Sequence, residues 1–360
     1  MMERKPDGPL RRGWTTGACA MAAATAAYEA LLTGAFPDPV TVRLPRGQTP
    51  SFPLAQQSVE NGSATAGIIK DAGDDPDVTH GALVIVTVRS DKPGGGVTFH
   101  AGEGIGTVTR PGLPIPPGEP AINPAPRAMI CEALGAIAAR HGIAPDVAVT
   151  ISIPGGEKIA ERTWNPRLGI IGGLSVLGTT GIVIPYSCSA WIHAIRQGID
   201  VARATDIHHI AGATGKTSES AVRKFHDLDE DAIIDMGDFV GGMLKYLNGH
   251  PLPRLTIAGG FAKLTKLAQG RLDLHSARSQ VDLGQLAAMA SARGAPPDVC
   301  DAMCAANTAA HALELGKGFS LGESVAAAAR DVVQAQLSAN VSVDVLVIDR
   351  QGQTIGHAGS

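Results

Sequence analysis

The sequence predicts a two-domain protein whose second half is an α/β domain built on a parallel sheet. The chain has 360 residues, more than a single hydrophobic core usually organises. Between residues 204 and 258, strand-like and helix-like segments alternate, and this order is typical of parallel strands joined by right-handed crossovers. Glycine-rich turns follow these strands, where the ligands of such sheets bind. The second half is therefore expected to contain a small-molecule site.

Residue types identify each element of the second half. Short runs of aliphatic and β-branched residues predict strands, and longer runs with helical spacing predict helices. The expected strands are residues 204–211, 232–235, 255–258 and 343–348, and the expected helices are residues 216–228, 237–247, 280–293 and 299–315.

The expected carboxyl ends of the strands carry the candidate binding residues. Five glycines that admit close approach of a ligand lie there: Gly212, Gly215, Gly237, Gly259 and Gly260. Asp235 and Asp238 close the second strand, where a carboxylate can accept hydrogen bonds from two ribose hydroxyls, although aspartate is also a common helix cap. The run at 212–217 is not a phosphate loop, because Ile210 replaces the first glycine of that motif.

The first half is expected to mix helices with strands. Small residues over 18–28 follow Thr15 and Thr16, whose hydroxyls suit an N-cap, so they predict a helix with an electropositive start near Arg11 and Arg12. Residues 94–127 have the composition of a long functional loop. Strands are expected at residues 40–44, 67–70, 83–88 and 147–153, and further helices at residues 128–140 and 190–197.

Residues 163–185 set glycines among aliphatic residues, with Asn165 and Arg167 near the start. Such a run is unfavourable as a plain helix or a plain strand. Its main-chain N–H groups, including those of Gly172 and Gly178, are free to turn toward an anion or a flat ring. A tight glycine-rich corner between packed strands explains the same run equally well.

Residues 70–79 hold four carboxylates within seven positions, but they lack the ligand alternation and the glycine of a calcium-binding EF-hand loop. A solvated acidic turn is one interpretation. The other is that crowding raises the pKa of one carboxylate, which would suit proton abstraction by Asp74 or Asp75.

Composition excludes several classes of function. The net charge of −4 and the 4% aromatic content argue against nucleic-acid binding. No apolar run is long enough for a membrane span, and five cysteines without a C-x-x-C pair fit reduced thiols, so we expect a cytoplasmic protein. We predict no metal site, because the neighbours His208 and His209 would point to opposite faces of a strand. The oligomeric state stays open, a homo-oligomer included.

Several motifs together resemble one family. They are Arg-Arg-Gly-Trp-Thr-Thr-Gly at 11–17, the acidic run at 70–79, Gly-Glu-Gly-Ile-Gly at 102–106, Ala-Ile-Asn-Pro-Ala-Pro-Arg at 121–127 and the run at 163–185. In order and nearly throughout the chain, they resemble the CbiD family, the C1-methyltransferases of cobalt-precorrin-5B in cobalamin biosynthesis. The resemblance implies transfer of a methyl group from S-adenosylmethionine to a contracted tetrapyrrole. It also implies an α+β layered domain over residues 1–198 for the tetrapyrrole and a Rossmann-like domain over 199–360 for the methyl donor.

The resemblance implies ligand-facing segments and no agreed catalytic base. The ring carries peripheral carboxylates, so we predict that Arg12, Arg110, Arg127 and Arg167 clamp them, although each arginine could equally tie loops together. The other predicted substrate contacts are Thr15, Thr16, Asn123, Asn165, Thr179 and Thr180. Two rival functions stay open at this point, a tetrapyrrole carrier and a dinucleotide-dependent oxidoreductase, and the absence of G-x-G-x-x-G counts against the second.

Overall fold

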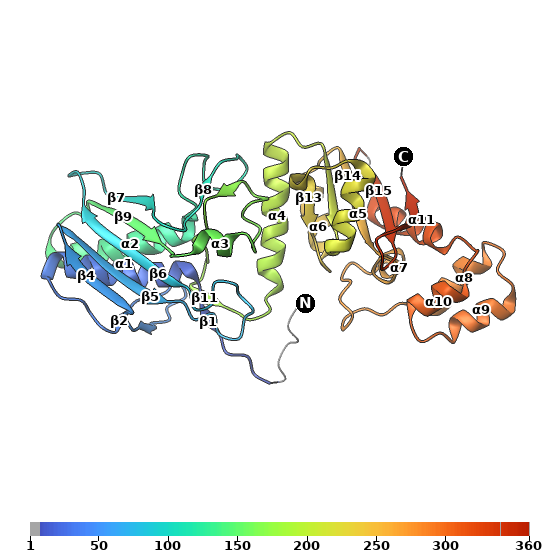
Figure 1. Cartoon of the computed structure of the whole chain (residues 1–360), viewed down its shortest axis with the longest axis horizontal. Helices are drawn as coiled ribbons and strands as arrows, with labels where there is room; N and C mark the ends of the chain where they lie inside the picture. The colour runs from blue at the N-terminus through green and yellow to red at the C-terminus, as the bar shows by residue number, and fades with distance from the viewer. Residues whose placement is uncertain (1–7, 339, 360) are drawn as a thin grey trace. The chain divides into compact units, whose positions relative to one another are not determined.

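The computed structural model describes residues 8–338 and 340–359. The chain forms two compact units, Met1–Ser187 and Cys188–Ser360, and each has its own hydrophobic core (Figure 1). Helix α4 (Cys188–Ala204) opens the second unit, so the predicted boundary at 198/199 passes through this helix. Within the described residues, none of the helices combines the length and the apolar character needed to cross a bilayer.

The first unit is built on a five-stranded sheet of mixed direction. Its strands are antiparallel to their neighbours except for the parallel pair β7 and β9. In spatial order they are β4 (Gln56–Glu60), β5 (Ser63–Ile69), β6 (Leu83–Ser90), β9 (Val147–Ser152) and β7 (Val97–Ala101). Three two-stranded ladders accompany it: β1 (Gly13–Trp14) with β11 (Ile182–Val183), β2 (Val40–Thr41) with β3 (Ser51–Phe52), and β8 (Thr107–Val108) with β10 (Ile170–Ile171).

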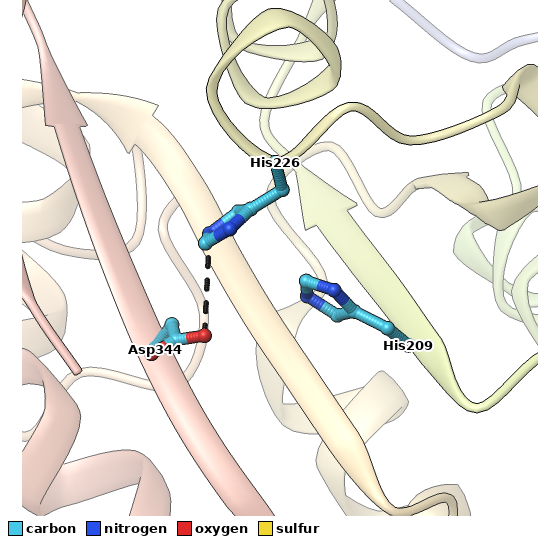
Figure 2. A group of neighbouring side chains, drawn as sticks. All are labelled: His209, His226 and Asp344. Atoms are coloured by element: carbon cyan, nitrogen blue, oxygen red, sulfur yellow. Dashed lines mark ion pairs between the residues drawn. The ribbon is translucent and has the colours of Figure 1, made fainter. Parts of the chain in front are cut away.

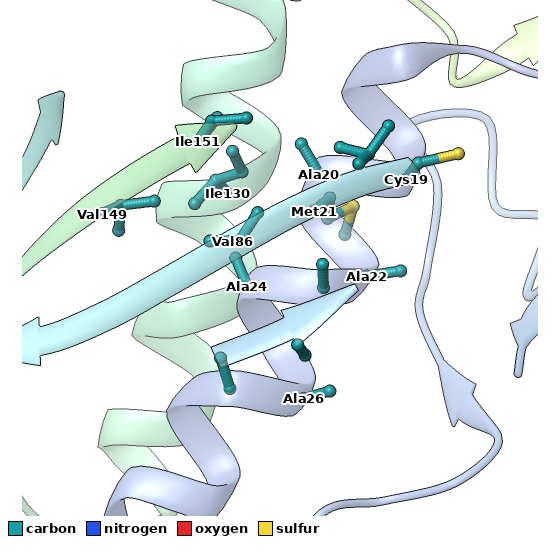
Figure 3. Packing of buried hydrophobic residues seen from close by; sticks show 14 of the residues in the cluster. Cys19, Ala20, Met21, Ala22, Ala24, Ala26, Val86, Ile130, Val149 and Ile151 are labelled. Carbon is teal, nitrogen blue, oxygen red and sulfur yellow. The ribbon is translucent and has the colours of Figure 1, made fainter. Parts of the chain in front are cut away.

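Two long helices, α1 (Thr16–Thr33) and α2 (Pro124–His141), cover this sheet, and the short α3 (Gly156–Ala160) follows β9. The Thr15 hydroxyl caps α1 by accepting a hydrogen bond from Ala18 N, and Gly34 ends the helix in the left-handed conformation. Small side chains let α1 approach the sheet closely: Figure 3 shows Ala20 and Ala24 beside Val86 of β6. Alanines predict a helix by propensity, and here they also permit its burial.

The second unit is built on a five-stranded sheet in the order β13, β12, β14, β15, β16. The first four strands are parallel and β16 is antiparallel to β15, so the prediction of a parallel sheet is confirmed for four strands. The strands are β12 (His209–Ala213), β13 (Ile233–Asp235), β14 (Arg254–Gly260), β15 (Ser342–Ile348) and β16 (Thr354–Ala358).

Helices cover both faces of this sheet. Val222 of α5 packs on Ala211, Ala258 and Leu346, which alternate with the residues of the other face. On that other face, Ile257 and its neighbours pack against helices α4, α6, α7 and α11. The helices that follow α4 are α5 (Lys216–His226), α6 (Val240–Gly249), α7 (Phe261–Ala268), α8 (Leu283–Ser291), α9 (Pro297–Cys304), α10 (Ala309–Leu315) and α11 (Leu321–Gln334), and a 3-10 turn spans Glu230–Ala232.

Several predicted elements need correction. The strand expected at 204–211 begins only at His209, because α4 continues to Ala204. The helix expected at 299–315 is two helices, since Thr308 caps α10 by accepting a hydrogen bond from His311 N at 3.1 Å. The expected loop at 94–127 contains the strands β7 and β8, and only two residues of 40–44 form a ladder. The elements α3, α7, α11, β4 and β16 were not predicted, nor were the two-residue strands β1, β3, β10 and β11.

Candidate functional site

The carboxyl edge of the parallel sheet in the second unit brings together the predicted glycines and aspartates. Strands β12, β13 and β14 end at Ala213, Asp235 and Gly260, and the turns after them lead into α5, α6 and α7. Gly215 and Gly260 are the residues directly before α5 and α7. The free N–H groups of these helix starts therefore point toward the same edge.

The glycines at this edge are of two kinds. A Cβ on Gly212 would lie 2.7 Å from Met243 Sδ, and one on Gly259 would lie 2.9 Å from Thr214 Cγ2, so packed side chains fill the space at both positions. At Gly215 and Gly260 a Cβ would meet nothing within 4 Å. A Cβ on Gly237 would come within 3.3 Å of the Trp191 ring. Open backbone thus remains at Gly215 and Gly260, where a ligand can approach closely.

A lysine crosses this edge. Lys263, in the first turn of α7, donates from Nζ to the Thr214 carbonyl oxygen at 3.0 Å and forms an ion pair with Asp238 Oδ1 at 3.0 Å. The Asp235 carbonyl oxygen accepts from Trp191 Nε1 at 2.9 Å. The sequence prediction included Asp238 and missed Lys263, although its place three residues after Gly260 was a usable signal. Lys263 fixes the turns after β12 and β13 relative to α7.

In the first unit, four of the motif segments lie side by side. Strand β1 pairs with β11, and Arg12 forms a bridge with Gly73 of the acidic loop. The Thr15 N–H donates to the Gly181 carbonyl oxygen at 3.0 Å. Further on, Gly17 N donates to Leu177 O and Asn123 N donates to Val176 O, each at 3.0 Å. Residues 11–17, 71–75, 121–127 and 176–186 therefore form one contiguous region, in which exposed residues such as Arg12 and Thr179 lie beside buried ones.

The amino-terminal ends of α1 and α2 meet in this region. A Cβ on Gly17 would lie 2.9 Å from Pro126 Cγ, which shows how closely the two helix starts approach. Thr15 and Thr16 are buried at the start of α1. Asn123 precedes α2 without making a side-chain cap. Two positive dipole ends side by side favour a negatively charged ligand group.

The acidic loop is tied down by specific partners. Asp71 forms a bidentate pair with the Arg11 guanidinium, and the buried Lys70 ammonium donates to Asp77 Oδ2 at 2.6 Å. Exposed Asp74 accepts the Arg11 N–H at 2.6 Å. Asp75, which is half-buried, accepts the Tyr186 N–H at 2.8 Å.

The pKa values in this loop differ according to these partners. Burial raises the pKa of Asp75, and the charge of Asp77 adds to the effect. Burial opposes ionisation of Asp77 too, but Lys70 and the donors of Thr79 outweigh it and lower the pKa. The Arg11 hydrogen bond lowers the pKa of Asp71 to about 2. Desolvation is therefore the main cause of the raised pKa in the loop, and crowding is secondary.

The predicted polar contacts of the first unit occupy different settings. Arg127 donates from Nε to Ile122 O at 2.9 Å and pairs through Nη2 with Glu119 Oε2 at 3.1 Å, the geometry of an arginine that ties a loop. Buried Asn165 donates to Gly173 O at 3.0 Å and supports residues 165–175. Arg12 is exposed, and its side chain makes no hydrogen bond or ion pair within the described part of the chain.

The remaining predicted contacts lie around these segments. The aliphatic part of Arg110 packs on Gly169, and the Arg167 guanidinium lies 5.9 Å from the Trp164 ring centroid. Thr179 is exposed, and the Thr180 hydroxyl donates to Ile182 O at 3.3 Å. The structure thus gathers Arg12, Thr15, Thr16, Asn123, Thr179 and Thr180 with the acidic loop, whereas Arg110, Asn165 and Arg167 cluster around residues 164–175.

The glycine-rich run at 163–185 is used mainly for packing. A Cβ on Gly173 would lie 2.3 Å from Gly104 O, and one on Gly178, at φ +121°, would lie 2.4 Å from Thr15 Cβ. Gly181 packs against Leu44. Gly172 is the member of this run with open space at its Cβ position. Of the two interpretations of the run, the tight corner accounts for most of its glycines.

A parallel sheet with open glycines at its carboxyl edge is typical of proteins that bind small molecules. Comparison with known proteins identifies the family. Residues 3–185 match the CbiD family model, and residues 273–359 match the CbiD C-terminal domain. The chain belongs to the CbiD family.

Named relatives extend over nearly the whole chain. A cobalt-precorrin-5B C(1)-methyltransferase of Paramagnetospirillum magneticum is 62% identical, over 97% of this chain and 98% of that protein. A protein of the same name from Brucella anthropi is 58% identical, over 96% and 95%. A crystal structure of a cobalamin biosynthesis protein (cbiD) from Archaeoglobus fulgidus is 30% identical and has a TM-score of 0.42, over 76% of this chain and 84% of that one.

Proposed function

We propose that this chain is an S-adenosylmethionine-dependent methyltransferase that methylates C1 of cobalt-precorrin-5B in cobalamin biosynthesis. The observation that carries the proposal is the 62% identity, over 97% of the chain, to a relative with that activity in its name. The free cysteines fit the reducing cytoplasm, where we place the enzyme.

The second unit, which we take to be Rossmann-like, binds the methyl donor at the carboxyl edge of its sheet. The open Cβ positions of Gly215 and Gly260 support this assignment, because side chains there would fill the space that a ligand needs. When bound, S-adenosylmethionine supplies an electrophilic methyl group. The N–H groups at the starts of α5 and α7 suit its carboxylate, and Asp235 and Asp238 suit its ribose hydroxyls. Gly237 lies in the turn between these two aspartates.

The first unit binds the tetrapyrrole. Exposed Arg12 and the paired starts of α1 and α2 suit the ring carboxylates, with Asn123 and Thr179 as neutral donors. Leu177 and Ile184, which are 51% exposed each, offer aliphatic surface to the ring face.

A proton acceptor is proposed beside this surface. Asp75 is favoured over Asp74, because burial raises its pKa and its position is fixed by Tyr186 N. The carboxylate accepts a proton from the ring, and the fixed orientation determines which position it can reach.

The test is an anaerobic incubation of the purified chain with the corrinoid precursor and methyl-labelled S-adenosylmethionine, followed by mass analysis. One labelled methyl group on the product, with the position at C1 established by NMR, is the expected result. Calorimetry with each ligand separates the rivals. Binding of the precursor without S-adenosylmethionine would indicate a carrier, and binding of NADPH would indicate an oxidoreductase.

A further inference from the structure

A polar cluster lies at the amino-terminal edge of the same parallel sheet, away from the strand ends described above. His209 begins β12, Asp344 lies near the start of β15, and His226 ends α5. Figure 2 shows the two imidazole rings and the carboxylate turned toward a common space. One potential ligand atom from each residue lies within 4.8 Å of the other two.

Strand register explains why these residues meet. Ala211 pairs with Thr256, and Thr256 pairs with Asp344, so these three lie on one face of the sheet. His209 is two residues before Ala211 and therefore shares this face, which α5 covers. His357 of β16 pairs with Leu346, so it lies on the same face as well.

Polar atoms in this cluster lack hydrogen-bond partners, although His226 Nε2 lies 4.0 Å from Asp344 Oδ2, the ion pair dashed in Figure 2. His226 Nε2, Asp344 Oδ1 and His357 Nε2 are buried without a hydrogen bond to any described residue. The Asp344 side chain is fully buried, and the His226 side chain is 9% exposed. Buried polar groups without partners are rare in native proteins, and each calls for an explanation.

The other atoms of the cluster are held in place. Asp344 Oδ2 accepts from Arg254 Nε at 2.7 Å, which leaves Oδ1 for another group. His209 Nε2 lies 2.8 Å from Thr256 Oγ1. Hydrogen bonds of this kind orient the ligands of metal sites.

We propose that His209, His226 and Asp344 bind a divalent metal ion of the zinc class. Two nitrogens and one carboxylate oxygen are a donor set that zinc accepts. Atoms that are each about 2.1 Å from one ion lie at most about 4.2 Å apart, so small side-chain rotations must draw the cluster together.

His357 is a further donor close to the cluster, since its ring centroid lies 6.2 Å from that of His226. Its Nε2 and Asp344 Oδ1 both lie beside Gly359: a Cβ on that glycine would be 3.1 Å from the first atom and 1.8 Å from the second. A bound ion would join α5 to β12 and β15, which makes the site structural. The sequence prediction of no metal site weighed groups that are close together along the chain, such as the adjacent His208 and His209. His226 and Asp344 lie far from His209 along the chain, so no spacing motif marks the set.

The test uses chelator-treated full-length chain without donor or tetrapyrrole. After incubation with zinc and removal of free ion, mass spectrometry should find one zinc per chain. His226→Gln should weaken zinc binding in calorimetry by more than about 100-fold, since loss of an outer-shell partner alone costs about 10–100-fold. The matched control is His208→Gln: exposed His208 adjoins His209 and points away, so affinity should not change.

A folded wild-type chain, judged by circular dichroism, that retains no stoichiometric zinc would overturn the proposal. So would a His226→Gln variant that binds zinc as tightly as His208→Gln. If His226→Gln does not fold, cobalt(II) added to the wild type decides instead. Intense visible absorption, typical of four-coordinate cobalt, supports the site, and the weak bands of the hydrated ion exclude it. If the site is excluded, the cluster is an ion network around Asp344 and Arg254.

Discussion

Two glycines of the first unit and two of the second serve different purposes in this chain. In the first unit, a Cβ on Gly173 would overlap Gly104, and one on Gly178 would overlap Thr15. The chain can pack at these two positions only because glycine has no side chain. In the second unit, Gly215 and Gly260 border open space at the carboxyl edge of the sheet. The same residue type thus supports packing in one place and leaves open space, where we propose that the methyl donor binds, in the other. Substitution can separate the two uses, because one lowers stability and the other lowers affinity.

The acidic residues of the first unit, like Gly173 and Gly178, mostly serve the fold. Asp75 is the exception that we propose for catalysis. Asp71 and Asp77 pair with cations of the fold, whereas Asp75 accepts a backbone N–H and has a raised pKa. We expect Asp75→Asn to lower kcat by about 10²–10⁴-fold in the labelled-methyl assay. The wild-type rate should fall as the pH decreases through the raised pKa, and the variant should lack this limb.

Asp74→Asn is the matched control, because Asp74 is the exposed neighbour whose Oδ2 accepts the Arg11 N–H. It should retain most of the activity. If Asp75→Asn keeps the wild-type kcat, the Asp75 carboxylate only positions Tyr186. Asp75 would then serve the fold, as Asp71 and Asp77 do.

Removal of one partner from the buried ion pair between Lys70 and Asp77 is expected to give the largest loss of stability among these variants. The Lys70 side chain is 1% exposed, so Asp77→Ala leaves a buried ammonium without its partner. The free energy of unfolding in urea should fall by about 3–5 kcal/mol. The exposed pair Arg330–Asp331 of the second unit is the control, and Asp331→Ala should change little.

The pH dependence of stability tests the same pair. The pKa of Asp77 is lowered in the folded chain, so its contribution is complete above the unfolded value of about 3.9 and is lost as the pH falls through the folded value. Between pH 5 and pH 2, the free energy of unfolding should therefore fall more steeply with decreasing pH for the wild type than for Asp77→Ala. Equal slopes would contradict the assignment.

Gly178→Ala is expected to have a somewhat smaller effect on stability. Its φ of +121° strains any other residue, and the new methyl group would overlap Thr15. The expected loss is about 2–3 kcal/mol in urea unfolding. Gly135→Ala is the control in the same unit: Gly135 lies within α2 with open space around it, so alanine should raise stability by about 0.5–1 kcal/mol. A Gly178→Ala variant as stable as the wild type would remove the packing explanation.

The fold was predictable where one local signal dominates. The β-branched run of β6 gave the correct strand, and the alternation around β12–β14 gave the correct order of elements although β12 begins only at His209, because burial on a sheet selects such residues. The break between α9 and α10 was not predictable from periodicity, since one Thr308 hydroxyl decides it. Helix α11 was missed, although Val325 and Ala329 bury one of its faces.

The candidate site was predictable as a set of segments and much less as a set of roles. Glycine at a strand end signals an unusual backbone, but its neighbours decide whether packing or a ligand requires it. Those neighbours, such as Met243 beside Gly212, come from distant parts of the chain. The partners of Arg127 are close in sequence, but whether a guanidinium turns toward them or toward a ligand is set by the folded loop.

The smallest expected effect tests the open glycines of the second unit. Gly260 has φ −66° and ψ 149°, which alanine adopts without strain, and a Cβ there meets nothing within 4 Å. Gly260→Ala should therefore leave urea unfolding nearly unchanged while the new methyl group occupies ligand space. We expect a roughly tenfold weaker affinity for S-adenosylmethionine in calorimetry, equivalent to about 1.4 kcal/mol. Gly249→Ala, also in open space but at the end of α6, should leave this affinity unchanged. Equal affinities of the two variants would mean that the donor does not approach Gly260. Gly260 would then differ from Gly173 and Gly178 only in how tightly it is packed.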